Sequence, residues 1–366
     1  MKNLSRLLGA TVLVAAAMFL PEVTETASAC TRVTFVGDSG IVITGRSLDW
    51  RTPIPTNIYV FPRGLQRASY NVPGKSINWT SAYGSVCAVG YDCGVTEGLN
   101  EKGLAVNLLY LPGTSYAAEG DTRPFMSTSL WAAYVLDNFA TTTEAVAQLR
   151  LDRFQINAPS MPGGSATTLH MAISDSTGNS AIIEYVDGKL QIHEGHQYQV
   201  LTNAPPYDQQ VAISDYWKTV GGMHMLPGTN RSQDRFTRAT FYLGALPKNS
   251  SHKVALGGVA GIIANCSVPT GISVPDQPEI STTQWRSISD QNECVYYFHV
   301  INSPGTFWVK LHEFDLYPGA PVMRLDVFNA RKDLVGNVIS DFRQTKDFTP
   351  MYEMTPEVAA RLMATE

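Results

Sequence analysis

The sequence offers little support for a nucleic-acid, metal or membrane-spanning function. It contains no run of basic residues, and its formal net charge is −5, which argues against nucleic acid as a partner. Its seven histidines show no H-x-x-x-H spacing and its five cysteines no C-x-x-C spacing, so we expect no metal site. After the first thirty residues, no apolar stretch is long enough to span a bilayer, which takes about 20 residues.

Familiar catalytic motifs are also missing. There is no G-x-S-x-G nucleophile elbow and no phosphate-binding loop. The segment Gly37-Asp38-Ser39-Gly40 matches the serine motif of trypsin-like proteases, but those enzymes carry their histidine and aspartate well before the serine. No histidine precedes Ser39, so we interpret this segment as a polar hairpin turn.

The first thirty residues have the parts of a secretory signal peptide. Two basic residues precede an apolar run from Leu7 to Leu20, which is too short to cross a membrane. A short polar stretch then ends in Ala27-Ser28-Ala29, a small-residue pattern typical of signal-peptidase cleavage. We therefore expect residues 1–29 to be removed, the mature protein to begin at Cys30, and the protein to be periplasmic or secreted.

A cysteine directly after a signal peptide has a second interpretation, the lipid-anchored binding lipoprotein acylated at that cysteine. That interpretation favours an apolar residue three places before the cysteine, whereas Ala27 stands there. It also favours a polar tether after the cysteine, whereas residues 31–36 alternate like a strand. The lipoprotein stays open as the alternative from another functional class.

Cys30 carries chemistry because of its position. As the first residue it would hold both a thiol and an α-amine, whose reference pKa is about 7.7–8.0. Near neutral pH the amine can accept the thiol proton, as in N-terminal nucleophile catalysis. A buried cysteine without a role is the competing interpretation. In an exported protein an odd cysteine count leaves one thiol over, and the others either pair or stay buried: Cys87, Cys93, Cys266 and Cys294.

The order of expected elements indicates an α+β fold. Strands come first, helices dominate the middle and strands return at the end. No internal repeat and no low-complexity linker interrupts the chain, so we expect residues 30–366 to form one domain. Strands are expected at 31–36, 41–46, between 85 and 110, at 168–174, 180–185, 189–192, 294–300 and 306–312, and helices at 125–139, 141–151, 207–218, 232–243 and 253–264.

Several spaced segments together resemble the choloylglycine hydrolases, a family that comprises penicillin V acylases and conjugated bile acid hydrolases. They follow one another in the same order over some 200 residues. The segments are Cys30-Thr31, Gly45-Arg46-Ser47-Leu48-Asp49-Trp50, Glu97-Gly98-Leu99-Asn100-Glu101-Lys102-Gly103-Leu104, Thr168-Leu169-His170, Leu201-Thr202-Asn203-Ala204-Pro205, and Leu226-Pro227-Gly228 followed by Asp234-Arg235-Phe236.

The resemblance implies a four-layer αββα N-terminal-nucleophile hydrolase that cleaves linear carbon–nitrogen amide bonds without a metal or organic cofactor. It implies that Cys30 attacks the amide, that Arg46 and Asp49 flank it, and that Asn203 donates to the oxyanion. Arg235 matches the second arginine of the family's site. On their own, Arg46 and Asp49 would pass for a surface ion pair, Asn203 for a turn residue and Arg235 for a solvated helix charge.

Two aromatic residues bear on the substrate. Tyr110 falls where penicillin V acylases tend to have Tyr, and its backbone N–H would complete the oxyanion hole. The tryptophan at position 50 resembles the pattern of the family's subgroup from Gram-negative bacteria. An aromatic wall suits a phenoxyacetyl or fatty acyl group better than a steroid, so the resemblance favours penicillin V or N-acyl homoserine lactones over conjugated bile acids as the small-molecule substrate. The family is commonly tetrameric, which implies a homotetramer.

Overall fold

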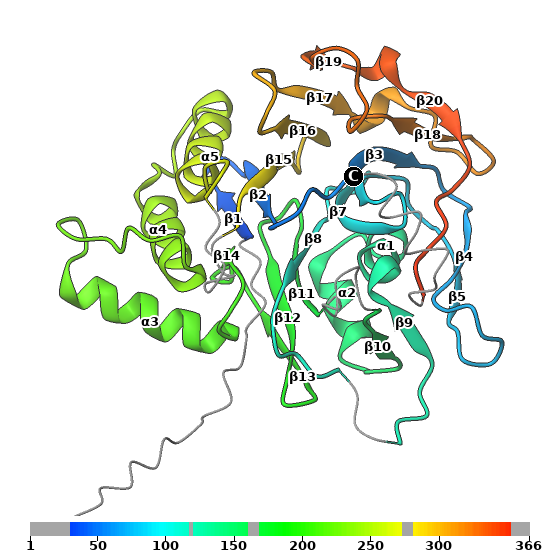
Figure 1. Ribbon diagram of the computed structural model, residues 1–366, viewed down its shortest axis with the longest axis horizontal. Coiled ribbons are helices and arrows are strands. Elements are labelled where there is room, and N and C mark those ends of the chain that lie inside the picture. Colours follow the sequence, from blue (N-terminus) through cyan, green and yellow to red (C-terminus); the bar gives the residue numbers. More distant parts are fainter. Residues whose placement is uncertain (1–29, 117–119, 160–167, 273–280, 353–366) are drawn as a thin grey trace, which may run out of the picture.

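Two large sheets lie face to face between two groups of helices (Figure 1). The computed structural model describes residues 30–116, 120–159, 168–272 and 281–352, so the expected signal peptide lies outside the described residues. The first large sheet has the order β14 (Val200–Leu201), β1 (Thr31–Val36), β2 (Val42–Asp49), β15 (Thr283–Asp290), β16 (Val295–Val300), β17 (Phe307–Lys310) and β19 (Gly336–Asn337). Its neighbouring strands are antiparallel except for β17 and β19.

The second large sheet is antiparallel throughout. Its order is β13 (Lys189–Glu194), β12 (Ser180–Val186), β11 (Leu169–Ser174), β8 (Ala105–Tyr110), β7 (Gly94–Asn100), β6 (Ser85–Gly90), β3 (Thr56–Phe61), β18 (Val322–Leu325) and β20 (Arg343–Thr345). Two small ribbons, β4 (Gln66–Ala68) with β5 (Asn78–Thr80) and β9 (Phe125–Ser127) with β10 (Gln155–Asn157), complete the strands of the described ranges.

The helices cover the outer faces of both sheets. On one side α4 (Ser232–Ala245) and α5 (His252–Cys266) pack on the first sheet, with α3 (Tyr207–Val220) against α4. On the other side α1 (Thr128–Asn138) and α2 (Thr142–Leu149) pack on the second sheet. The predicted α+β class and its αββα layering are confirmed. In the part of the chain described here, none of the helices has the length and apolar character needed to cross a membrane.

One helix starts later than its sequence pattern suggested. A helix was predicted over 125–139, but residues 125–127 form strand β9 and the helix begins at Thr128. The side chain of Ser127 caps it by accepting from Ser129 N, which ends the strand and starts the helix at one residue. The cap predicted before α2 is present, because Thr141 Oγ1 accepts from Glu144 N at 3.2 Å.

The alternation of β1 and β2 places polar side chains between the two sheets. A Cβ on Gly45 would lie 2.7 Å from Val259 on α5, so this face of β2 meets the helices at a distance that only glycine allows. Its neighbour Arg46 therefore faces the second sheet. By the same alternation Arg32 of β1 points that way, where it donates to Ser174 Oγ at 2.6 Å. A polar layer thus fills the space between the sheets beside Cys30.

Candidate active site

Cys30 stands immediately before β1 and is buried, with 3% of its surface exposed. The structure describes the uncut chain, so the Cys30 nitrogen is a peptide nitrogen here. Its N–H donates to Asn203 Oδ1 at 2.5 Å. Because β14 pairs with β1, the residues after β14 lie next to the start of β1. The fold therefore brings Asn203 to Cys30 across 173 positions of sequence.

Arg46 is a buried partner of the Cys30 thiol rather than half of a surface ion pair. Its Nη2 lies 3.6 Å from Cys30 Sγ and donates to Leu108 O at 2.9 Å. Its Nη1 forms an ion pair with Glu97 at 3.1 Å. Burial lowers the pKa of Arg46, but the negative charges of Cys30 and Glu97 outweigh it, and the pKa is raised. A guanidinium this close favours thiolate over thiol.

Glu97 is a functional residue that the sequence argument missed. It lies on β7 and is buried. Besides Arg46, its carboxylate accepts from Tyr296 Oη at 2.6 Å and from Asn107 Nδ2 at 3.2 Å. These bonds hold the carboxylate where it fixes the Arg46 side chain. An acidic residue within a predicted strand can be seen in the sequence. Its pairing with Arg46 cannot, because Arg46 lies on a strand of the other sheet.

Asp49 lies at the end of the same strand as Arg46 but on its opposite face, since the two are an odd number of positions, three, apart. Ser47 Oγ donates to its Oδ2 at 3.4 Å. Burial raises the pKa of Asp49 to about 7, although Arg235, Thr283 and Arg46 each act to lower it. The carboxyl group therefore changes charge near neutral pH, which is a property typical of functional sites.

Arg235 is also buried, which differs from a solvated helix charge. It extends from α4 to the start of β1, where Nη1 donates to Cys30 O and to Thr31 Oγ1 (2.7 Å). Its Nη2 donates to Asn203 Oδ1 at 2.9 Å. Burial lowers the pKa of Arg235, and the charges of Asp49 and Cys30 counter this. The Arg235 guanidinium thus contacts Cys30, Thr31 and Asn203 at the same time.

Tyr110 is the last residue of β8, and this end of the strand faces Cys30. Leu111 N donates to Thr168 O at 3.0 Å. The preceding pair in this register, Tyr110 with Leu169, must then point its backbone groups away from β11. On that other side the pairing with β7 extends only as far as Asn107. The N–H and C=O of Tyr110 therefore point toward the site.

Side chains from the first sheet reach this edge. Arg46 donates to Leu108 O, and Asn203 Nδ2 donates to Tyr110 O at 2.7 Å. Because Asn203 Oδ1 meets two donors and Nδ2 meets a carbonyl, the orientation of the amide is defined by its partners. One proton of Nδ2 remains for a further acceptor. That proton and the Tyr110 N–H lie on the same side of the β8 edge.

A pocket of about 140 Å³ opens at Cys30. Trp50 and Tyr110 both line it, and their rings meet edge to face with centroids 5.3 Å apart. Arg46 and Asp49 line it as well. Among the other lining residues are Cys93, Leu169 and Met351, which the sequence did not assign to the site. Met351 enters from the far end of the described chain, where its N donates to Cys93 O at 3.2 Å.

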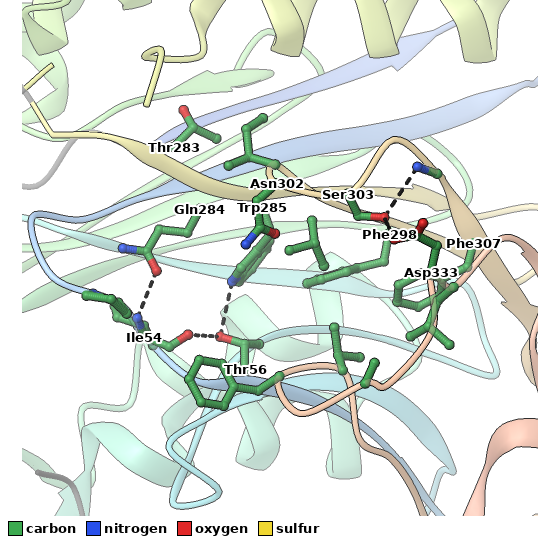
Figure 2. Close-up of a pocket in the computed structure, with 18 of the residues that line it drawn as sticks. Ile54, Thr56, Thr283, Gln284, Trp285, Phe298, Asn302, Ser303, Phe307 and Asp333 are labelled. Carbon is green, nitrogen blue, oxygen red and sulfur yellow. Dashed lines mark hydrogen bonds between the residues drawn. The ribbon is translucent and has the colours of Figure 1, made fainter. Parts of the chain in front are cut away.

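A larger cavity of about 490 Å³ (Figure 2) shares Ile54 with this pocket as a lining residue. Cys30 does not line it, so the smaller pocket is the candidate active site. Figure 2 shows Gln284 bonded to Ile54 N, at 2.8 Å, and Trp285 bonded to Thr56. Gln284 also donates to Trp50 O at 3.2 Å. Strand β15 thereby holds the loop that carries Trp50.

The remaining cysteines and histidines supply no further centre among the described residues. All five cysteines are buried and no disulfide joins them. Burial raises the pKa of Cys87 to about 12 and that of Cys266 to about 11, so neither is a reactive thiolate near neutral pH. Across the described ranges, no group of three His, Cys, Asp or Glu side chains is arranged to hold a metal ion.

The chain matches a known protein family. Residues 30–331 match the family model of linear amide C–N hydrolases of the choloylglycine hydrolase family. The match begins at Cys30 and covers most of the chain. The chain belongs to the choloylglycine hydrolase family.

The most similar relatives of this choloylglycine hydrolase family member include acylases. It is 41% identical over 322 residues to a penicillin V acylase of Pectobacterium atrosepticum, covering 82% of this chain and 85% of the relative. It is 28% identical to a bile salt hydrolase/transferase of Clostridium perfringens, covering 74% and 88%. The solved structure of penicillin V acylase from Agrobacterium tumefaciens superimposes with a TM-score of 0.82 at 44% identity, covering 88% of this chain and 99% of that one. The chain is therefore a linear amide hydrolase of the penicillin V acylase and bile salt hydrolase type.

Proposed function

We propose that this amide hydrolase uses Cys30 as an N-terminal nucleophile, after removal of residues 1–29 during export, and that it acts on penicillin V and on N-acyl homoserine lactones. The observation that carries the proposal is the arrangement around one residue. Arg46 stands 3.6 Å from the Cys30 sulfur, while Asn203 accepts from the Cys30 nitrogen. The thiol and the nitrogen that cleavage would convert to the α-amine thus contact separate partners.

The chemistry follows from these contacts. The neutral α-amine of Cys30 takes the thiol proton, and Sγ forms a bond to the amide carbon. The oxygen of the tetrahedral intermediate accepts from Tyr110 N–H and from the remaining proton of Asn203 Nδ2. The amine then gives its proton to the leaving nitrogen as the C–N bond breaks. Water attacks the resulting thioester, which releases the carboxylic acid and restores the thiol.

The two buried guanidiniums assist this cycle. Arg46 and Arg235 both lie next to Cys30, and a positive neighbour disfavours an additional positive charge on the amine. The same charges stabilise the thiolate. Asp49, on the face of β2 opposite to Arg46, offsets the positive charges of the two guanidiniums when its carboxyl group is ionised. In that form the carboxylate also holds the α-amine.

The pocket supports an acyl group of moderate size. Its volume of about 140 Å³ is below the roughly 300–1,000 Å³ of sites that enclose a whole drug-sized ligand, so it accommodates the acyl arm and leaves the amine part outside. Trp50, Tyr110 and Met351 give it aromatic and apolar walls. A phenoxyacetyl arm or a fatty acyl chain matches this space better than a rigid steroid. The similarity to penicillin V acylases supports the same choice.

The mechanism is tested by comparing chains that differ only at the N-terminus. A chain that begins at Cys30 should hydrolyse penicillin V, and a folded chain with one extra residue before Cys30 should not. Intact mass confirms each terminus and also reports a diacylglyceryl group, which would identify a lipoprotein instead. Equal turnover by the two chains would refute the N-terminal mechanism.

The substrate is tested with a panel of amides. We expect higher kcat/KM for penicillin V and for a long-chain acyl homoserine lactone than for benzylpenicillin and glycocholate. If glycocholate is the best substrate, the enzyme is a conjugated bile acid hydrolase and the proposed acyl preference is wrong. Gel filtration of the processed enzyme tests the homotetramer that the family resemblance implies, and fractionation of cells tests export to the periplasm.

A further inference from the structure

A buried His–Glu pair connects the two sheets beside the active site. His170 lies on β11 and Glu184 on β12, and both are fully buried. His170 Nδ1 lies 2.7 Å from Glu184 Oε1, and His170 Nε2 lies 2.8 Å from Thr202 O. The second carboxylate oxygen of Glu184 accepts from Tyr207 N at 2.9 Å. The pair therefore binds both ends of the segment 202–207, which contains Asn203.

The partners define the proton content of this pair. A carbonyl only accepts, so His170 Nε2 must carry a proton for Thr202 O. His170 Nδ1 faces a carboxylate, and two lone pairs at 2.7 Å would repel, so a proton must also lie between His170 and Glu184. The pair holds both protons and is neutral as a whole. It can thus stay buried without an unsatisfied charge.

We propose that His170 and Glu184 are positioning residues that set the distance between the two oxyanion donors. This inference rests on the proposed function. The Tyr110 N–H comes from the second sheet, whereas Asn203 follows β14 of the first sheet. In the β8–β11 register Leu169 pairs with Tyr110, so His170 directly follows the residue opposite one donor. Its bond to Thr202 O holds the residue directly before the other donor.

Two further bonds to the backbone of Asn203 come from the helices. Asn203 N donates to Ser232 Oγ at 2.8 Å, and Gln210 Nε2 donates to Asn203 O at 2.7 Å. Those bonds fix the Asn203 backbone relative to α3 and α4, while its side chain reaches β8 through the bond from Nδ2 to Tyr110 O at 2.7 Å; the bond from His170 to Thr202 O adds a backbone tie to the same sheet. His170 ties the segment to the sheet that carries Tyr110. A displacement of about 1 Å in such a group costs about 10²-fold in rate.

The test compares two variants that avoid an isolated buried charge. In Glu184→Gln the amide can donate to His170 Nδ1 and accept from Tyr207 N, so every bond of the pair can be kept. In the double variant His170→Phe/Glu184→Gln the bond to Thr202 O is lost, while the ring volume and the bond to Tyr207 N remain. We expect Glu184→Gln to stay within a few-fold of wild type. We expect the double variant to lose about 10²-fold in kcat with KM changed by less than a few-fold.

Alkylation of Cys30 by iodoacetamide separates positioning from general damage, because it forms no oxyanion. We expect equal alkylation rates in wild type and both variants. His299→Phe, the same change on β16 where His299 Nδ1 bonds Gly305 O at 3.0 Å, is the matched control and should retain full kcat. Full activity of the double variant, or a parallel loss of alkylation and kcat, overturns the inference. A wild type that is alkylated at Cys30 but hydrolyses no amide overturns the proposed function instead.

Discussion

Replacing Asp49 with asparagine should stabilise the protein above neutral pH. Burial raises the pKa of Asp49 from 3.8 to about 7, a difference of about 3 units at about 1.4 kcal/mol each. The folded state thus binds a proton that the unfolded state has already released between these two pH values. Stability from this group is fully present below pH 3.8 and is lost as pH rises through about 7. Above that pH, the charged carboxylate costs up to about 4 kcal/mol.

The assay is urea unfolding of wild type and Asp49→Asn between pH 4 and 8.5. It is best performed on the uncut chain, in which no α-ammonium adds charge beside the carboxyl. We expect the two proteins to be similar near pH 4 and the variant to be more stable by up to about 4 kcal/mol at pH 8.5. A difference that stays constant across this range would refute the assignment. In the processed enzyme the same variant should have a lower kcat/KM, and wild-type activity should rise through about pH 7.

Three further changes test other parts of the site. Asn203→Ala should lower kcat by about 10²–10³-fold and change KM less, because the oxyanion exists only in the transition state; steady-state kinetics with penicillin V give both values, and a loss of a few-fold would remove Asn203 from the oxyanion hole. Trp50→Ala should raise KM for penicillin V several-fold, because the acyl arm loses part of its apolar contact with that side chain; an unchanged KM in the same assay would mean that Trp50 serves packing alone. Arg32→Met should raise the free energy of unfolding by about 1–4 kcal/mol. The reason is that burial lowers the pKa of Arg32 to about 9, and that its Nε and Nη1 have no hydrogen-bond partner among the described residues. A lower urea midpoint for the variant would show that this charge is stabilising.

Local patterns in the sequence predicted most elements of the fold. The alternation of β-branched residues gave β1 with the same ends as in the structure, Thr31–Val36. The second strand was expected to end at Arg46, but β2 continues to Asp49 because β15 pairs with it from Ile43 to Asp49. That partner comes from far along the chain, so no local pattern could indicate the extension.

The site divides in the same way. Position and family resemblance singled out Cys30 and Asn203, and the structure brings them into contact. Glu97 and His170 were within the segments that carry the resemblance, but nothing in the sequence connects either residue with its function. Their importance depends on which strand of one sheet faces which strand of the other. Met351 could not be foreseen, because its place in the pocket depends on the path of the C-terminal segment.

Met351 makes the pocket at Cys30 depend on the C-terminal part of the described chain. The wall that it contributes is held by its backbone, whose carbonyl accepts from Ser127 and Ser129. Cys30 and Met351 lie close to opposite ends of the described chain and share one pocket. During synthesis, that pocket can form only after residues 30–351 have left the ribosome. A truncation that removes Met351 would therefore take away one wall of the pocket that contains Cys30.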